Sequence, residues 1–165
     1  MIDVPVRILI ADDEVYIREG LRDALQRPGR TVDIVGDGHA ARRSFDASLY
    51  DVILLDLRMP GPSGMELLVE ISDRLPDTQT LLLTAHGNID TAVEAMKAGA
   101  FDFLTKPVDL DHLRLVVDRA LEQTQLVREN RQLHDLLEQK ENDDAFRRIV
   151  HRSPAMQRAT RTVKQ

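Results

Sequence analysis

The sequence predicts an α/β fold built on a doubly wound parallel sheet of five strands. Short apolar runs of strand length alternate with amphipathic windows of helical spacing. The runs are Val6 to Ala11, Thr31 to Gly36, Asp51 to Asp56, Gln79 to Ala85 and Ala100 to Leu104. Because a helix between two strands brings those strands parallel, this alternation favours one sheet with helices on both faces.

Each element has its own support in the sequence. The second, third and fourth runs are nearly continuous in apolar residues, which predicts strands buried on both faces. Ser63 and Glu66 have the spacing of a capping box, and Asn88 is placed to cap the following helix. The apolar helix faces comprise Ile17, Leu21 and Leu25 in the first window, Leu67, Ile71 and Leu75 in the third, and Ile89, Val93 and Met96 in the fourth.

Composition narrows the class of protein. The 165 residues suffice for one domain with an appendage, and a net charge of -6 argues against a chain-wide nucleic-acid surface. The chain has no cysteine, which excludes disulfides and thiolate metal sites and fits a reducing cytoplasm. The first apolar run is too short for a signal peptide and no segment approaches membrane-spanning length, so we expect a cytoplasmic protein without membrane contact.

Polar residues stand where the strands end. Asp12 and Asp13 follow the first run, Asp56 ends the third, Thr84 lies at the end of the fourth, and Lys106 follows the fifth. In open parallel sheets the carboxyl ends of the strands gather the functional groups. Two carboxylates about 4 Å apart repel by roughly 4 kcal/mol at an effective dielectric of about 20, so three of them need a counter-charge. Oxygen ligands without His or Cys favour a hard ion, Mg²⁺.

This set of groups suits phosphoryl transfer, with Asp56 as the nucleophile. A transferring phosphoryl group spreads negative charge over three oxygens, which a metal, an ammonium and a hydroxyl can stabilise. An aspartate can itself accept the group as an acyl phosphate. Taken singly, the carboxylates are ordinary turn formers or helix caps, Thr84 an ordinary strand residue and Lys106 a surface lysine. Their convergence on one edge is what favours a functional site.

At these positions the sequence resembles the receiver domain of two-component response regulators. The motifs IADDE, LLDLRMPG, LTAHG and FLTKP occur in the family's order and spacing between Val6 and Leu121. The resemblance implies a flavodoxin-like sheet of order 2-1-3-4-5 and a regulatory phosphoacceptor rather than a metabolic enzyme. It implies that Asp56 takes a phosphoryl group from the phosphohistidine of a sensor histidine kinase.

The resemblance also implies roles for the neighbours of Asp56. Mg²⁺ would be bound by Asp13, Asp56 and the backbone carbonyl of Arg58, with Asp12 acting largely through water. Thr84 would contact the phosphoryl oxygens and Lys106 would pair with the acceptor site. Further residues comprise Phe103 as the switch aromatic, Pro107 after a cis peptide bond, and Arg58 and His86 as modulators of the phosphoryl lifetime.

Two other classes share part of the pattern. A phosphatase of the haloacid-dehalogenase type also uses Mg²⁺ and a strand-end aspartate, but it needs a second Asp where this chain has Arg58. A nucleotide-binding doubly wound domain would have a glycine-rich turn after the first strand, where this chain has ADDEV. A receiver coupled to a different output also stays open.

The helical pattern from Asp109 continues past Leu121 without Pro or Gly. One heptad register places Leu126 and Leu133 at d, and Val116, Gln123, Asn130 and Leu137 at a, which predicts a coiled-coil linker and a homodimer. Asn at an a position favours a parallel dimer. An upstream phase comprising Leu113, Val117, Ala120, Thr124 and Val127 would pack on the receiver. The alternative is a solvated linker helix.

The last segment resembles the opening of the AAA+ ATPase domain of sigma-54-dependent activators of the nitrogen-regulation type. Ser153 and Pro154 suit a helix start there, and no phosphate-binding loop follows. We therefore expect a receiver at 1–121, a linker at 122–144 and a truncated ATPase start at 145–165. A full-length protein would bind ATP, sigma-54 polymerase and DNA through parts absent here. The last 21 residues hold six basic and no acidic side chains, so a direct nucleic-acid contact is the alternative.

Overall fold

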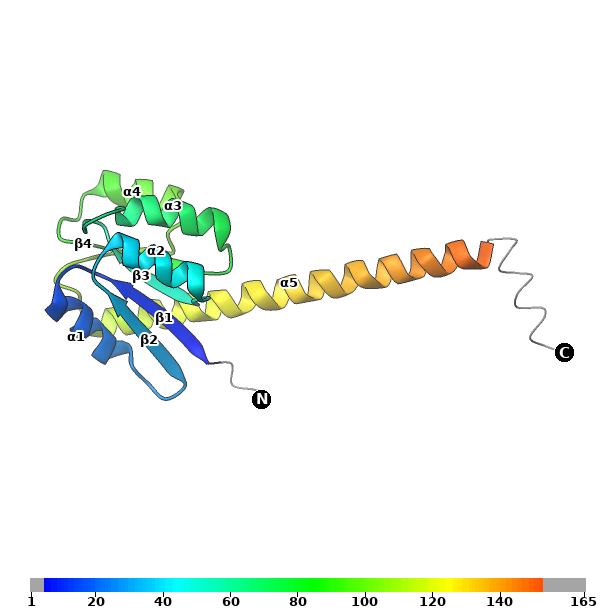
Figure 1. Cartoon of the computed structure of the whole chain (residues 1–165), viewed down its shortest axis with the longest axis horizontal. Coiled ribbons are helices and arrows are strands. Elements are labelled where there is room, and N and C mark those ends of the chain that lie inside the picture. Colours follow the sequence, from blue (N-terminus) through cyan, green and yellow to red (C-terminus); the bar gives the residue numbers. More distant parts are fainter. Residues whose placement is uncertain (1–4, 153–165) are drawn as a thin grey trace. The chain divides into compact units, whose positions relative to one another are not determined.

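All five predicted strands form and lie parallel in one sheet, and the fold prediction is confirmed. The computed structural model describes residues 5–152. The sheet has the order β2-β1-β3-β4-β5, which places β3 at its centre (Figure 1). The elements are β1 Val6–Ala11, α1 Val15–Leu25, β2 Arg30–Val35, α2 Gly38–Ala47, β3 Val52–Asp56, α3 Gly64–Arg74, β4 Gln79–Thr84, α4 Ile89–Lys97, β5 Asp102–Thr105 and α5 Leu110–Arg152.

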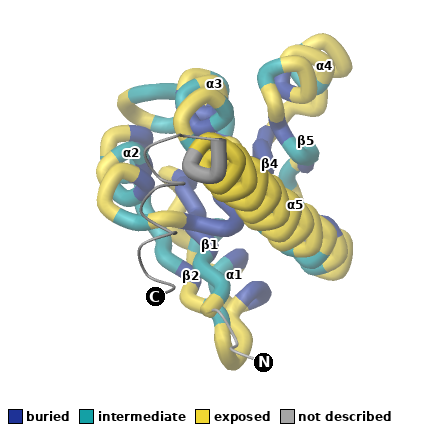
Figure 2. Tube along the Cα trace, turned by 90° about the vertical axis from the view of Figure 1, so that its right-hand side faces the viewer, coloured by how far each residue is buried: buried dark blue, intermediate teal, exposed yellow. Residues whose placement is uncertain are grey.

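Two apolar layers cover the two faces of the sheet. Alternate residues of a strand point to opposite faces, so Ile8 and Ile10 of β1 face one layer, and Leu9 and Ala11 face the other. The first layer is completed by α1 and the beginning of α5, and the second by α2, α3 and α4. Figure 2 shows β1 and β4 as buried segments between the helices. The sheet is therefore fixed from both sides.

Two strand predictions need correction. The second strand was expected to be buried on both faces, but Val32 is the one residue of β2 that is buried. The reason is its place at the edge of the sheet, where one side has no neighbouring strand. The fifth strand begins at Asp102 rather than at Ala100, after a single backbone bond from Phe101 N–H to Thr80 O of 2.8 Å.

The predicted helix starts at α3 and α4 are confirmed. The Ser63 hydroxyl accepts a hydrogen bond from Glu66 N–H, and the Glu66 carboxylate accepts one from Ser63 N–H, which is a complete capping box. The Asn88 side chain accepts a hydrogen bond from Asp90 N–H at the start of α4. Helix α1 begins differently, because its N-cap residue Glu14 makes no side-chain capping bond.

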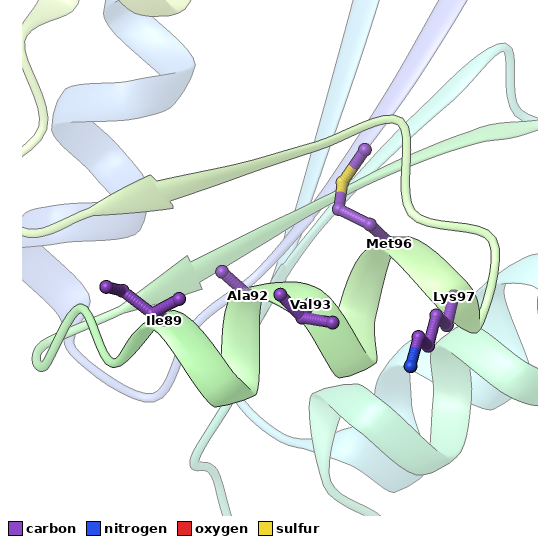
Figure 3. Close-up of a pocket in the computed structure, with 5 residues that line it drawn as sticks. All are labelled: Ile89, Ala92, Val93, Met96 and Lys97. Atoms are coloured by element: carbon purple, nitrogen blue, oxygen red, sulfur yellow. The ribbon is translucent and has the colours of Figure 1, made fainter.

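The apolar face expected to bury α4 is exposed instead. Ile89, Val93 and Met96 are 80%, 45% and 50% exposed, and with Ala92 and Lys97 they line a hollow on one helix (Figure 3). The small residue Ala95 makes the buried contact with the sheet. Helical spacing shows which residues share a face, but alanine can form the buried face where a helix lies close to a sheet.

Helix α5 extends through two units, Met1–Gln125 and Leu126–Gln165. In the first unit Leu113, Val117, Ala120 and Thr124 are buried, as predicted for four of the five residues of the upstream phase, whereas Val127 of the second unit is only partly buried. Val116 is also buried in the core, so its assignment to the dimer-facing register is wrong. In the second unit Leu126, Leu133 and Leu137 are each about 60% exposed. Ser153 and Pro154 lie outside the described residues, and no described helix is long and apolar enough to cross a membrane.

Candidate functional site

Four strands of the sheet bring polar side chains to one cavity at its carboxyl edge. Asp12 and Asp13 directly follow β1, Asp56 is the last residue of β3, Thr84 is the last residue of β4, and Lys106 follows β5. The cavity has a volume of about 570 Å³, and its lining includes all of these except Asp12. The parallel pairing of β1 with β3 and of β3 with β4 explains the convergence, because it aligns the strand ends.

Three carboxylates lie close together in this cavity. One oxygen from each of Asp12, Asp13 and Asp56 can be chosen so that all lie within 4.8 Å of one another. Asp12 is fully buried and Asp56 is 5% exposed, whereas Asp13 is exposed. The Asp12 Oδ1 atom accepts a hydrogen bond of 2.9 Å from Glu14 N–H, which fixes the rotation of that side chain.

Lys106 is the cation that faces this cluster. Its Nζ lies 2.7 Å from Asp12 Oδ2, 3.4 Å from Asp56 Oδ2 and 3.2 Å from Glu14 Oε1. Burial alone would lower the pKa of Lys106, but the close ion pair with Asp12, together with Asp56 and Glu14, raises it above its usual value. The ammonium therefore stays charged. Sequence reasoning missed Glu14, whose only signal was its place directly after the Asp pair.

The Asp56 carboxylate is destabilised electrostatically in its ionised form. Burial, followed by the neighbouring charge of Asp12, raises the pKa of Asp56 from 3.8 to about 6. Lys106 and the Arg58 N–H act in the opposite direction, the latter through a long contact of 3.5 Å to Asp56 Oδ1. One ammonium thus fails to offset the negative charge of the cluster.

The donor set fits a hard divalent cation. The buried Asp12 Oδ2 accepts no well-aligned hydrogen bond, although the Lys106 ammonium lies 2.7 Å away. Asp13 presents its carboxylate from the exposed side of the same cluster. All the available ligands are oxygen atoms, which Mg²⁺ prefers. An ion of charge +2 would also supply the positive charge that Asp56 lacks.

Thr84 is turned toward its own loop. Its hydroxyl donates to the His86 carbonyl at 3.1 Å and accepts from the His86 N–H at 3.2 Å. Phe103 of β5 is partly buried and packs against the layer that contains α2, α3 and α4. His86 and Arg58 both line the cavity, and the Lys106–Pro107 peptide bond is cis.

The start of α3 lies tightly against the end of β3. A Cβ atom at Gly64 would lie 2.4 Å from the backbone oxygen of Asp56, so no larger residue fits without a shift. Gly64 N–H also donates to Leu57 O at 3.2 Å. This packing fixes the backbone immediately after Asp56, including the segment that carries the Arg58 carbonyl.

Comparison with known proteins decides the family. Residues 8–118 match the response regulator receiver domain. The chain belongs to this family. It is 40% identical over 159 residues to the C4-dicarboxylate transport transcriptional regulatory protein DctD of Pseudomonas aeruginosa, covering 94% of this chain and 33% of that protein. It is 39% identical over 150 residues to the regulatory protein AtoC of Escherichia coli, covering 91% of this chain and 32% of that protein.

The receiver fold also matches solved structures. The beryllofluoride-activated NtrC4 receiver domain dimer superimposes with a TM-score of 0.68 at 33% identity, covering 72% of this chain and 98% of that one. The chain spans about one third of the length of the curated relatives DctD and AtoC. This receiver domain therefore corresponds to one part of those longer regulatory proteins.

The receiver domain brings together the residues that the sequence singled out. Asp12, Asp13, Asp56 and Lys106 form one charged cluster, and Thr84 borders the same cavity. Phe103 packs in the apolar layer behind that edge. Besides Glu14, two further polar residues line the cavity, Asn88 and Thr91, to which the sequence gave no role in a site. Their helical and capping positions gave no signal for a site.

Proposed function

We propose that this receiver domain accepts a phosphoryl group from a sensor histidine kinase onto Asp56 in the presence of Mg²⁺. The observation that carries the proposal is the excess of negative charge around the buried Asp56, which three carboxylates create and one lysine does not offset. Such a cluster suits a reaction in which a metal ion and a phosphoryl group bind side by side. The family membership of the chain supports the same function.

The residues of the site divide the work of transfer. Mg²⁺ would be held by Asp13, Asp56 and the Arg58 carbonyl, with Asp12 through water, and would neutralise charge on the phosphoryl oxygens. An Asp56 carboxylate oxygen attacks the phosphorus atom while the bond from phosphorus to the kinase histidine nitrogen breaks. The imidazole leaves with the bonding electron pair and then takes a proton from solvent.

Lys106 and Thr84 stabilise the product. The Lys106 ammonium already lies 3.4 Å from Asp56 Oδ2. After transfer it can pair with a phosphoryl oxygen in place of this carboxylate oxygen. The Thr84 hydroxyl would exchange the His86 carbonyl for a phosphoryl oxygen. Movement of Thr84 leaves space for Phe103 to turn inward, which shifts an existing equilibrium of the surface formed by α4, β5 and α5. The exposed apolar residues of α4 in Figure 3 belong to that surface.

The output is a change in a homodimer of a sigma-54-dependent transcription activator. Leu126, Leu133 and Leu137 are exposed along α5 and, with Asn130, would form a short parallel coiled coil. The similar NtrC4 receiver is described as a dimer. We assign the receiver to 1–121, the linker to 122–144 and the start of an ATPase domain to 145–165. The full-length protein would bind ATP, sigma-54 polymerase and DNA through other parts.

Intact mass spectrometry tests the acceptor. The chain is incubated with Mg²⁺ and acetyl phosphate, and wild type is compared with Asp56→Asn. We expect one added phosphoryl group on wild type and none on the variant. A wild type that gains no mass, and that also fails to bind beryllofluoride, would refute the proposal. Repeated turnover of a phosphomonoester would instead favour the phosphatase reading.

Size-exclusion chromatography with light scattering tests the dimer. Leu133→Asp introduces a charge at a predicted d position and should shift the chain toward monomer. Gln132→Asp introduces the same charge one residue away, on the predicted outer face, and should leave the association unchanged. Equal behaviour of the two variants would rule out this helix face as the interface.

The flanking residues control the lifetime of the phosphoryl group. Arg58 and His86 line the cavity from two different loops. Each can therefore affect how water reaches the acyl phosphate. We expect Arg58→Ala and His86→Ala to change the dephosphorylation rate, measured by loss of the added mass with time. Unchanged rates in both variants would show that neither residue has this role.

A further inference from the structure

Arg18, on the second turn of α1, reaches back to the loop that carries two of the carboxylates. Its Nη1 donates to the backbone carbonyl of Asp12 at 3.1 Å and to that of Asp13 at 3.2 Å. One guanidinium therefore ties together two consecutive carbonyl groups. Neither the sequence motifs nor the family match gave this residue a role at the site.

The other contacts printed for this loop involve its side chains and the Glu14 N–H rather than the two carbonyls, because Glu14 N–H bonds Asp12 Oδ1 and Lys106 pairs with Asp12 and Glu14. The backbone pairing between β1 and β2 ends with Asp12 N–H donating to Val35 O at 3.1 Å. Helix α1 begins at Val15 without a side-chain capping bond from Glu14. Between these two points Arg18 supplies a donor to the carbonyls of Asp12 and Asp13.

The space for this contact comes from Gly36, just beyond β2. A Cβ atom at Gly36 would lie 3.1 Å from Arg18 Nη1 and 3.5 Å from its Cζ. The guanidinium thus lies directly against the backbone of the residue that follows β2. It lies between Gly36, which follows β2, and the loop that follows β1.

We propose that Arg18 is a positioning residue for the divalent-cation site. By bonding both carbonyls it fixes the backbone orientation at Asp12 and Asp13, and hence the directions in which their carboxylates leave the chain toward Asp56. The inference rests on the proposed function for the identity of the cation. It assigns Arg18 no contact with the metal or with the phosphoryl group.

Electrostatics and positioning make opposite predictions for the loss of Arg18. Removing a positive charge near a cation site strengthens cation binding if charge alone matters. Removing a tie that orients two of the ligands weakens it, and losing such outer partners typically costs about 10-fold to 100-fold in metal affinity. The direction of the change therefore separates the two roles.

The experiment measures Mn²⁺ binding by electron paramagnetic resonance of the free ion, with Mg²⁺ as competitor. It compares wild type, Arg18→Met and Arg22→Met. Arg22 lies one turn further along α1 and pairs with Asp23 at 3.4 Å, so its variant removes the same charge from the same helix. We expect Arg18→Met to bind Mn²⁺ about tenfold more weakly, and Arg22→Met to bind as wild type or slightly more tightly.

A second readout needs no metal. Amide hydrogen exchange in EDTA should become faster across residues 12–16 in Arg18→Met, including at Glu14, whose N–H donates to Asp12 Oδ1. The core strands should exchange as in wild type. Unchanged exchange in this loop, or unchanged or tighter Mn²⁺ binding, would overturn the inference. A wild type that binds no Mn²⁺ while the loop still loosens in the variant would instead count against the proposed function.

Discussion

Replacing Asp56 by asparagine should stabilise the metal-free protein. Burial and the charge of Asp12 raise the pKa of Asp56 from 3.8 to about 6, so the folded chain binds a proton at Asp56 more tightly than the unfolded chain does. Stability then falls as pH rises, because the folded state holds more protons across this interval. A difference of about 2 pKa units corresponds to about 3 kcal/mol.

The sign of the effect sets the pH window. The destabilisation caused by ionised Asp56 is absent below about pH 3.8 and complete above about pH 6. At pH 7.5 Asp56→Asn should therefore raise the free energy of unfolding by up to about 3 kcal/mol, and at pH 4.5 by only about 1 kcal/mol. Because asparagine keeps the size of the side chain, the change isolates the charge.

Urea unfolding in EDTA measures this difference. Tyrosine fluorescence is a suitable signal, since Tyr50 is 3% exposed in the fold and becomes exposed on unfolding. The control is Asp73→Asn on α3, away from the cluster, which should change stability little at either pH. A variant at position 56 no more stable than wild type at pH 7.5 would refute the charge-excess reasoning.

Three further outcomes follow from the same site. Gly64→Ala should destabilise the chain by about 1–3 kcal/mol, because its Cβ would lie 2.4 Å from the Asp56 backbone oxygen. The control Gly20→Ala should stabilise α1 by about 0.5–1 kcal/mol, because a Cβ atom there would have nothing within 4 Å. Equal unfolding midpoints of the two variants would contradict both expectations. Lys106→Met should raise the pKa of Asp56 further, because Lys106 lowers this pKa in the native site. A ¹³C NMR titration of the Asp56 carboxyl group would measure the change. Mn²⁺ binding should weaken about tenfold from pH 7 to pH 5, as protonation of Asp56 near pH 6 competes with the metal; a flat profile would exclude Asp56 as a ligand.

Much of the fold could be predicted because its signals are local and repeat. Strand length, helical spacing and the capping box at Ser63 each constrain a few neighbouring residues, and together they give the alternation of strands and helices. The face of a helix that meets the sheet is not a local property. Ala95 is buried in α4 while Ile89 is 80% exposed, which depends on how closely the helix approaches the sheet.

The same division holds for the site. Asp12, Asp13 and Asp56 could be predicted because strand ends of a parallel sheet converge by geometry alone. Glu14 and Arg18 could not be predicted, because their contacts depend on side-chain conformation rather than on strand position. Glu14 pairs with Lys106 after β5, and Arg18 of α1 bonds to the Asp12 carbonyl after β1. Val116 was placed wrongly because a heptad register does not distinguish a helix face that packs on its own domain from one that packs on a partner.

The geometry around Asp56 suits the proposed combination of metal binding and switching at one cluster. The fold holds three carboxylates within 4.8 Å of one another at the cost of stability, since packing of the strands fixes positions that the charges alone would avoid. Any ligand that offsets the charge binds the folded state preferentially and stabilises it. In the proposed function a phosphoryl group on Asp56 would alter the partners of Lys106 and Thr84 at once, because Lys106 already contacts Asp56 and the Thr84 hydroxyl bonds to its own loop. In the proposed switch, the electrostatic repulsion at the strand ends would supply free energy that a change at Asp56 transmits to α4 and β5.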